Sequence, residues 1–247
     1  MALPGGHTDT DLRPGGWLRP HADQLVDVAP AHAVGRGLTV GVLALQGAFA
    51  EHAVAVRRLG ASVLEVRTPA QLEDVDALIM PGGESTTMSK LLVTSGLFDP
   101  IARRIGDGMA VFGTCAGMIL LADDVLDGRP DQRSFAAIGL AVRRNGYGRQ
   151  IDSFEADLDV DGFDEPFRAV FIRAPLVEQT ANDVQVLARW NANAVLCRRD
   201  AVMTAAFHPE LTADVRIHAL FLKMVESRTT KTVGAQKRSV PTNTGGN

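Results

Sequence analysis

The sequence is poor in cysteine, has little net charge and contains no long apolar run. Two cysteines among 247 residues make no disulfide framework, so a disulfide-held secreted domain is excluded and a reduced, cytoplasmic protein is expected. A formal net charge of -4 gives no electrostatic basis for nucleic-acid binding. No apolar run approaches the roughly 20 residues of a membrane span, and the N-terminus lacks the pattern of a secretory signal. We therefore expect neither a nucleic acid nor a membrane as a partner.

The apolar residues lie between two polar ends. Residues 1–36 are rich in Pro, Gly and Asp and have no sustained apolar period, and residues 229–247 are polar throughout. Neither segment can bury enough apolar surface to fold, so we predict two disordered extensions. The overall apolar content of 46% is enough for a full core. We predict one domain over residues 37–228.

Within residues 37–228, short apolar runs alternate with stretches of helical spacing. The expected strands are 38–45, 62–66, 77–80, 109–112, 136–142, 154–160, 169–172, 184–188, 194–197 and 202–207. The expected helices are 49–59, 85–92, 116–122 and a closing helix over 213–225. Strands joined by helices predict the α/β class, with a doubly wound, mostly parallel sheet and helices on both faces.

A glycine-flanked cysteine stands between a buried strand and an apolar helix. The segment Gly113-Thr114-Cys115-Ala116-Gly117 is the cysteine form of the G-x-S-x-G nucleophile elbow, a tight turn that presents the nucleophile at the carboxyl end of the sheet. A helix start favours the thiolate, and the N–H of Ala116 is placed to stabilise an oxyanion. The alternative is a structural cysteine in a Gly-rich turn. Cys197 has no neighbouring glycine and is expected in the core.

His208 and Glu210 are the candidate base and its orienting group. Pro209 biases His208 toward an extended backbone, and residues i and i+2 of an extended segment point to the same side, so the two side chains are predicted to converge. The alternatives are a strand-end histidine and a helix-start acid. His52 fits either a packing or a functional role, and His218 is expected to be packed or exposed. Without other ligands at suitable spacing, no metal is expected.

A glycine loop follows the strand over 77–80. The segment Pro81-Gly82-Gly83-Glu84-Ser85-Thr86-Thr87 offers backbone N–H groups for an anion, and a substrate carboxylate or amide fits it better than a nucleotide because the P-loop lysine pattern is missing. The alternative is a simple helix cap by Glu84 or Ser85.

Several segments occur in the order of one known family and span nearly all of residues 37–228. They are GVLALQGAFAEH (41–52), PGGESTTM (81–88), FGTCAGMILLA (112–122), RRNGYGRQIDSFEADL (143–158), FIRAP (171–175) and FHPEL (207–211). The chain resembles the class I glutamine amidotransferases and, among them, the glutaminase subunits that serve pyridoxal 5'-phosphate synthase. The cysteine elbow and the HPE segment are common to the class I enzymes, whereas LQGAFAEH, GGESTTM, GRQIDSFE and FIRAP are more specific to the vitamin B6 branch.

The resemblance implies hydrolysis of L-glutamine through a glutamyl thioester, without a cofactor. Ammonia would pass to a separate barrel-shaped pyridoxal 5'-phosphate synthase subunit in a hetero-oligomer. By position, Cys115 is the implied nucleophile, His208 the acid and base, and Glu210 its orienter. Gly47 and Ala116 would provide oxyanion N–H groups. The implied glutamine-binding residues are Gly83, Glu84, Ser85, Arg144, Ile172 and Arg173.

Two departures from the family pattern and three rival functions accompany this resemblance. The N-terminal extension lies outside the pattern, and the stretch IGLAVRRN (138–145) is a few residues shorter than usual before Arg144. The rivals are a glutaminase for histidine or purine synthesis, a catalytically silent docking subunit, and a cysteine peptidase or esterase on a related sheet.

Overall fold

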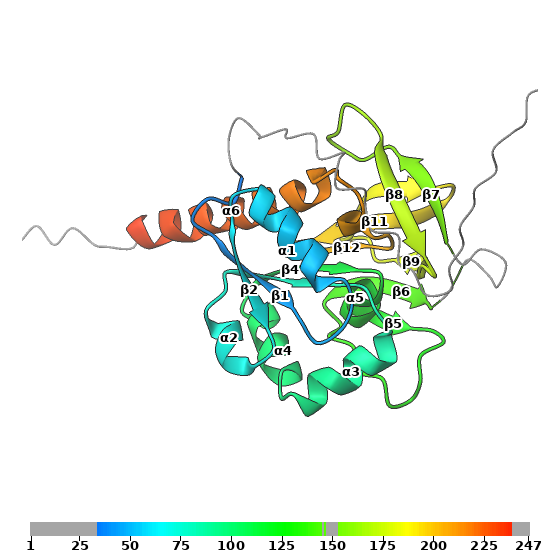
Figure 1. The fold of residues 1–247 in the computed structure, drawn as a ribbon, viewed down its shortest axis with the longest axis horizontal. Helices are drawn as coiled ribbons and strands as arrows, with labels where there is room; N and C mark the ends of the chain where they lie inside the picture. Colours follow the sequence, from blue (N-terminus) through cyan, green and yellow to red (C-terminus); the bar gives the residue numbers. More distant parts are fainter. Residues whose placement is uncertain (1–33, 145, 147–152, 239–247) are drawn as a thin grey trace, which may run out of the picture.

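A seven-stranded sheet forms the centre of the protein in the computed structural model, which describes residues 34–144, 146 and 153–238 (Figure 1). The strand order is β10-β11-β12-β4-β3-β1-β2. In chain order these strands are β1 (Thr39–Leu43), β2 (Ser62–Val66), β3 (Ala77–Met80), β4 (Ala110–Thr114), β10 (Gln185–Trp190), β11 (Asn193–Arg199) and β12 (Val202–Ala205). The pairs from β12 to β2 are parallel, and β10 and β11 extend the sheet in antiparallel pairing.

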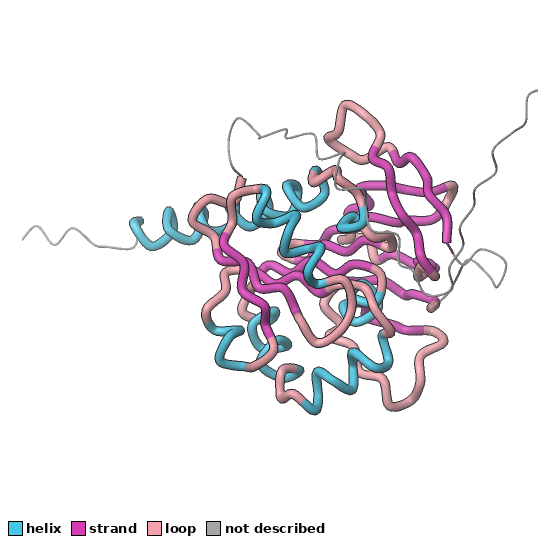
Figure 2. The backbone as a smooth tube through the Cα atoms, viewed as in Figure 1, coloured by secondary structure: helices cyan, strands magenta, loops and turns pink. Residues whose placement is uncertain are grey.

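Helices cover both faces of this sheet, as Figures 1 and 2 show. On one face lie α1 (Phe49–Arg58) and α6 (Arg216–Arg238), and on the other α2 (Pro69–Glu73), α3 (Ser85–Thr94), α4 (Phe98–Gly106) and α5 (Ala116–Leu121). Because both faces are covered, every residue of β3 and β4 is buried, as expected for the middle of a parallel sheet. The α/β, doubly wound prediction is confirmed.

A smaller sheet and a hairpin pack at the β10 end of the central sheet (Figure 1). The small sheet contains β5 (Ala122–Val125), β6 (Ile138–Arg143) and β9 (Leu176–Thr180), and the hairpin consists of β7 (Ser153–Leu158) and β8 (Phe167–Ile172). The rings of Phe154 and Phe171 stack with centroids 4.6 Å apart, and Trp190 of β10 lies 4.4 Å from Phe154. These aromatic contacts pack the hairpin against the central sheet.

Two α-helices and two strands of the described residues were not predicted from the sequence: α2, α4, β5 and β9. The short helix α2 depends on a capping box in which Thr68 and Gln71 satisfy each other's backbone N–H groups. Strand β5 begins directly where α5 ends, and its ADDV sequence has two exposed aspartates. The sequence therefore has neither the apolar alternation nor the turn that would predict a strand here. Within the described residues, no helix has the length and apolar character needed to cross a membrane.

The ends of the domain differ in part from the expectation. Helix α6 continues to Arg238, so residues 229–238, predicted to be without order, are helical. Extending a helix that is already nucleated by buried Ile217, Phe221 and Leu222 costs far less than starting one. Residues 1–33 and 239–247 lie outside the described residues, and so does most of the GRQIDSFE segment.

Candidate active site

The candidate site lies where four neighbouring parallel strands end. The chain leaves β1, β3, β4 and β12 at their carboxyl ends and continues into the segments that hold Gly47, Gly82, Cys115 and His208, respectively. Because these strands are adjacent in the order β12-β4-β3-β1, the four segments meet at one edge of the sheet. Open α/β sheets bind their ligands at this edge.

Cys115 occupies a strained turn between β4 and α5. Its backbone has φ 48° and ψ -104°, a left-handed conformation that costs a residue with a side chain about 1–3 kcal/mol. Its N–H donates to the carbonyl of Ala205 on β12 at 2.8 Å. A side chain on Gly113 would come within 2.6 Å of the Gly117 carbonyl, and one on Gly117 would overlap the Met80 carbonyl oxygen. The two glycines therefore let α5 start directly against β3 and β4.

Cys115, His208 and Glu210 form one buried group. The Nδ1 of His208 lies 2.8 Å from Oε1 of Glu210, and the imidazole also interacts electrostatically with the side chain of Cys115. Gly82 packs against both Cys115 and His208, since a Cβ there would lie 3.3 Å from Cys115 Cβ and 3.1 Å from His208 Nδ1. The Sγ of Cys115 is 3.8 Å from the carbonyl oxygen of Ile172 on β8.

The predicted convergence of His208 and Glu210 is confirmed, but the predicted extended route between them is wrong. Pro209–Leu211 is a short 3-10 helix, so Glu210 folds back beneath the imidazole instead of standing two residues along a strand. His208 itself is not helical, with φ -108° and ψ 85°, and its N–H donates to the carbonyl of Val170 at 2.8 Å. Proline at the first helical position suits such a turn because it has no N–H to satisfy.

The charges in this group support one another. Burial alone would lower the pKa of His208, but its hydrogen bonds and charge interactions with Cys115 and Glu210 raise that pKa to about 10. Burial would likewise raise the pKa of Glu210, but the facing His52 and His208 hold it at about 2. An imidazolium between a carboxylate and a sulfur stabilises a thiolate, which is the arrangement required for acyl transfer through a covalent intermediate.

The glycine loop before α3 is closed by a side-chain cap. Glu84 accepts hydrogen bonds from the N–H groups of Thr86 and Thr87 at 3.0 and 2.6 Å, so the helix-cap alternative is confirmed and these two N–H groups are already paired. These hydrogen bonds outweigh the opposing effect of burial and lower the pKa of Glu84 to about 2. Arg144 extends to this cap and donates to Oγ1 of Thr86 at 3.0 Å and to Oε1 of Glu84 at 3.3 Å.

The structure therefore brings Arg144 and Glu84 together. The Arg144 N–H donates to Asp127 at 2.7 Å, and β6, which ends at Arg143, pairs with β9 with a register irregularity between Ala141 and Val142. Ile172 ends β8 with its carbonyl oxygen beside Cys115, and the next residue, Arg173, has a positive φ of 42°. Gly47 also has a positive φ, 89°, and packs against the Gly82 carbonyl.

Residues 42–227 match the SNO glutamine amidotransferase family. This match covers well over half of the chain and includes every residue of the buried group. The chain belongs to the SNO glutamine amidotransferase family.

Members of this glutamine amidotransferase family are similar to the chain over nearly their whole length. A protein of Mycobacteroides abscessus named "Pyridoxal 5'-phosphate synthase subunit PdxT" is 53% identical over 188 residues, which are 76% of this chain and 97% of the relative. The protein of the same name in Roseiflexus sp. is 53% identical over 189 residues and is matched over 100% of its length. A solved structure described as "Crystal structure of glutamine amidotransferase" has 47% identity and a TM-score of 0.72, covering 76% of this chain and 98% of that one.

This glutamine amidotransferase site also contains two histidines to which sequence reasoning assigned no role. His52 of α1 and His218 of α6 are fully buried, and Nε2 of His52 lies 3.3 Å from Oε2 of Glu210. His52 follows the Gly47 turn and ends the GVLALQGAFAEH segment, but its place early in a helix does not separate a packing role from a functional one, and His218 lies inside the closing helix. Only the packing of α1 against both α6 and the Pro209–Leu211 turn brings them together.

Proposed function

We propose that this chain hydrolyses L-glutamine to L-glutamate and ammonia and is the glutaminase subunit of a pyridoxal 5'-phosphate synthase. The observation that carries the proposal is Cys115 on its strained elbow beside the buried His208–Glu210 pair. The names of relatives that are about half identical to the chain support the choice of pathway. The domain proposed for this activity spans residues 37–228.

In the first half of the reaction, the Cys115 thiolate attacks the side-chain carbonyl carbon of glutamine. The carbonyl electrons move to oxygen, and the backbone N–H groups of Gly47 and Ala116 are the proposed donors to that oxyanion. Removing one such donor typically costs about 3–4 kcal/mol of transition-state stabilisation. Ala116 is the first residue of α5, so its N–H has no partner within the helix. His208 then protonates the departing nitrogen, the carbon–nitrogen bond breaks, and ammonia leaves a glutamyl thioester.

In the second half, His208 acts as a base. The neutral imidazole removes a proton from water, and the resulting hydroxide attacks the thioester carbonyl carbon. The carbon–sulfur bond then breaks, which releases glutamate and regenerates the Cys115 thiolate. Glu210, whose Oε1 is 2.8 Å from Nδ1 of His208, holds the ring in the tautomer whose Nε2 faces the reacting atoms. General acid–base catalysis of this kind contributes about 10²–10⁴-fold to the rate.

The glutamine-binding residues are proposed from the family resemblance, by their positions in the sequence. The set consists of Gly83, Glu84, Ser85, Arg144, Ile172 and Arg173. Glu84 and Arg144 are directly paired at 3.3 Å, which offers one group of each sign to the amino and carboxylate ends of an amino acid. Because the cap consumes two helix N–H groups, the carboxylate would be bound by the guanidinium and the remaining backbone donors.

We further propose that the ammonia is used by a partner subunit, the barrel-shaped synthase, in a hetero-oligomer. Ammonia released into water is lost to the synthesis, so coupling of hydrolysis to an acceptor is expected. A cytoplasmic location is proposed because Cys115 and Cys197 are both free, which is typical of a reducing compartment.

The test is a coupled assay of glutamate release from glutamine, with and without the candidate synthase subunit. The full chain should release glutamate faster in the presence of the synthase, and Cys115→Ala should release none while still binding the synthase. A Cys115→Ala protein that retains hydrolysis refutes the proposed nucleophile. A wild-type protein activated by a synthase of histidine or purine synthesis, but not by this one, refutes the assigned pathway.

A further inference from the structure

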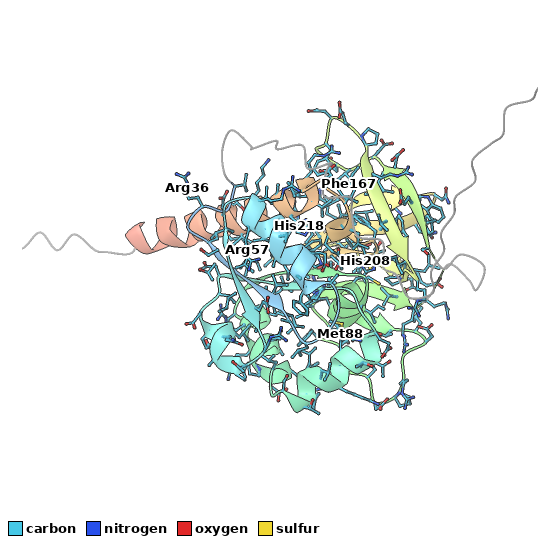
Figure 3. The ribbon with its side chains drawn as sticks, in the orientation of Figure 1. Arg36, Arg57, Met88, Phe167, His208 and His218 are labelled. Carbon is cyan, nitrogen blue, oxygen red and sulfur yellow. The ribbon has the colours of Figure 1, made fainter. Side chains whose placement is uncertain are left out.

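Behind the Cys115–His208–Glu210 group, two buried histidines continue the chain of polar contacts. The Nδ1 of His52 lies 2.9 Å from Nε2 of His218, and Nε2 of His52 lies 3.2 Å from Oγ1 of Thr114 and 3.3 Å from Oε2 of Glu210. In Figure 3, His208 and His218 both lie beside α1, the helix that carries His52. The sequence of contacts is therefore His218, His52, Glu210 and His208.

Both of these imidazoles are neutral at physiological pH. Burial is the main cause that lowers the pKa of His52, and burial together with His52 lowers the pKa of His218 to about 3. The charged groups that face His52 are Glu210 and His208 from the loop after β12 and Glu51 from α1 itself. A neutral imidazole carries one N–H, so its position decides what His52 presents to Glu210.

Electrostatics selects the proton position. With the proton on Nε2, His52 donates to Thr114 and directs the positive end of the N–H dipole toward the nearby carboxylate oxygen. With the proton on Nδ1, a nitrogen lone pair would face that oxygen at 3.3 Å. Oε2 of Glu210 has no other hydrogen-bond partner among the described residues, and neither has Nδ1 of His218. The Nε2–H tautomer also lets the His218 N–H donate to His52 and leaves only a lone pair unpaired, which costs less than an unpaired buried donor.

We propose that His52 is a positioning residue that acts through Glu210, and that His218 sets the tautomer in which His52 does so. The inference rests on the proposed Cys115–His208–Glu210 triad. Glu210 uses one oxygen to hold His208, and His52 faces the other, so the carboxylate is kept ionised and in one orientation. Without the His52 donor, Glu210 stabilises the His208 imidazolium less, and the thiolate–imidazolium pair exists over a narrower pH range.

Two amide substitutions separate positioning from packing. His52→Gln places an amide nitrogen where Nε2 now faces Thr114 and Glu210, whereas His52→Asn places one where Nδ1 now faces His218. Both variants are polar and leave His52's neighbours unchanged. They differ in volume by one methylene, so a packing role predicts different stabilities but the same pH profile. Val56→Ala is the matched control, because Val56 is fully buried on the same helix and its truncation destabilises without touching the polar chain.

The measurement is the rate of Cys115 alkylation by iodoacetamide as a function of pH, followed by mass spectrometry in a Cys197→Ala background. Alkylation reports the thiolate directly and needs neither glutamine nor a synthase. In His52→Asn, the midpoint of the alkaline change in alkylation rate, where His208 loses its proton near pH 10, should fall by about one unit, a roughly tenfold weaker hold on that proton. His52→Gln and Val56→Ala should keep the midpoint of the parent protein. His218→Leu, which frees the tautomer, should shift it in the direction of His52→Asn but by less.

The inference is overturned if His52→Asn and His52→Gln have the same midpoint in the pH profile of alkylation, whether both are shifted or neither is. It is also overturned if Val56→Ala shifts the midpoint as much as His52→Asn does. Thermal unfolding of each variant verifies that the protein is folded, and the His218→Leu comparison remains if His52→Asn does not fold. A parent protein whose alkylation profile is unchanged by His208→Ala instead refutes the proposed triad. The two failures are therefore distinguishable.

Discussion

Gly82 is the position where the smallest change should have the largest effect on catalysis. It is buried after β3, and an added Cβ would lie 3.1 Å from Nδ1 of His208, closer still to Cε1, and 3.3 Å from Cβ of Cys115. The backbone does not require glycine here, because Gly82 is absent from the residues with a positive φ. The substitution Gly82→Ala therefore tests the contact itself, with little contribution from backbone strain.

The size of the effect follows from how the imidazole is held. Ordinary contact with a Cβ begins at 3.4 Å. Because Cε1 of His208 is the atom nearest to the added Cβ, it sets the displacement, and the ring must withdraw by roughly 1 Å. A misplacement on this scale can cost about 10²-fold in rate. The ring cannot withdraw freely, because Glu210 holds Nδ1 at 2.8 Å and both side chains are buried. We expect kcat for glutamine hydrolysis to fall about 100-fold, whereas overpacking should cost stability only about 1–3 kcal/mol.

The assay is glutamate release in the presence of the synthase subunit, with thermal unfolding measured on the same protein. Gly106→Ala is the control, because nothing lies within 4 Å of a Cβ at this position near the end of α4. It should keep full activity and gain up to about 1 kcal/mol of stability. A folded Gly82→Ala protein with a kcat within about threefold of wild type would refute the reasoning, because the ring would then have room that this packing does not provide.

Three further predictions concern stability and substrate binding. The pKa of His208 is raised from 6.5 to about 10, so its contribution to stability is complete below pH 6.5 and is lost as the pH rises toward 10. Denaturant titrations should show that Cys115→Ala loses less unfolding free energy over this pH range than the parent protein does. An equal loss contradicts an interaction between His208 and Cys115. Gly117→Ala places a Cβ against the Met80 carbonyl and should destabilise by about 3 kcal/mol or more in the same titrations, so a neutral result is evidence against the tight elbow. Arg144→Lys loses the fork that binds Thr86 and Glu84 and should raise the KM for glutamine about tenfold with little change in kcat; an unchanged KM removes Arg144 from the binding site.

Local features were predictable because short-range chemistry determines them. A tight turn needs small residues next to the nucleophile, so Gly113 and Gly117 identify the elbow within five residues. A base and its orienter two positions apart also need no long-range information to be paired, although the turn between them was mistaken for extended chain. Glu84 was likewise recognisable as a cap, because a side chain at a helix start accepts from N–H groups two and three residues onward.

Tertiary structure alone decided which distant segments meet. Strand β12 lies beside β4 although a small sheet and a hairpin separate them in the chain, and this pairing is what puts His208 next to Cys115. The partnership of His52 with His218 and Glu210 depends on α1 packing against α6 and the Pro209–Leu211 turn. Apolar periodicity predicts that a face of a helix or strand is buried. It does not predict which element packs against that face, because many elements can bury the same apolar residues. The choice among them is made by the packing of the whole chain, which no local stretch of residues contains.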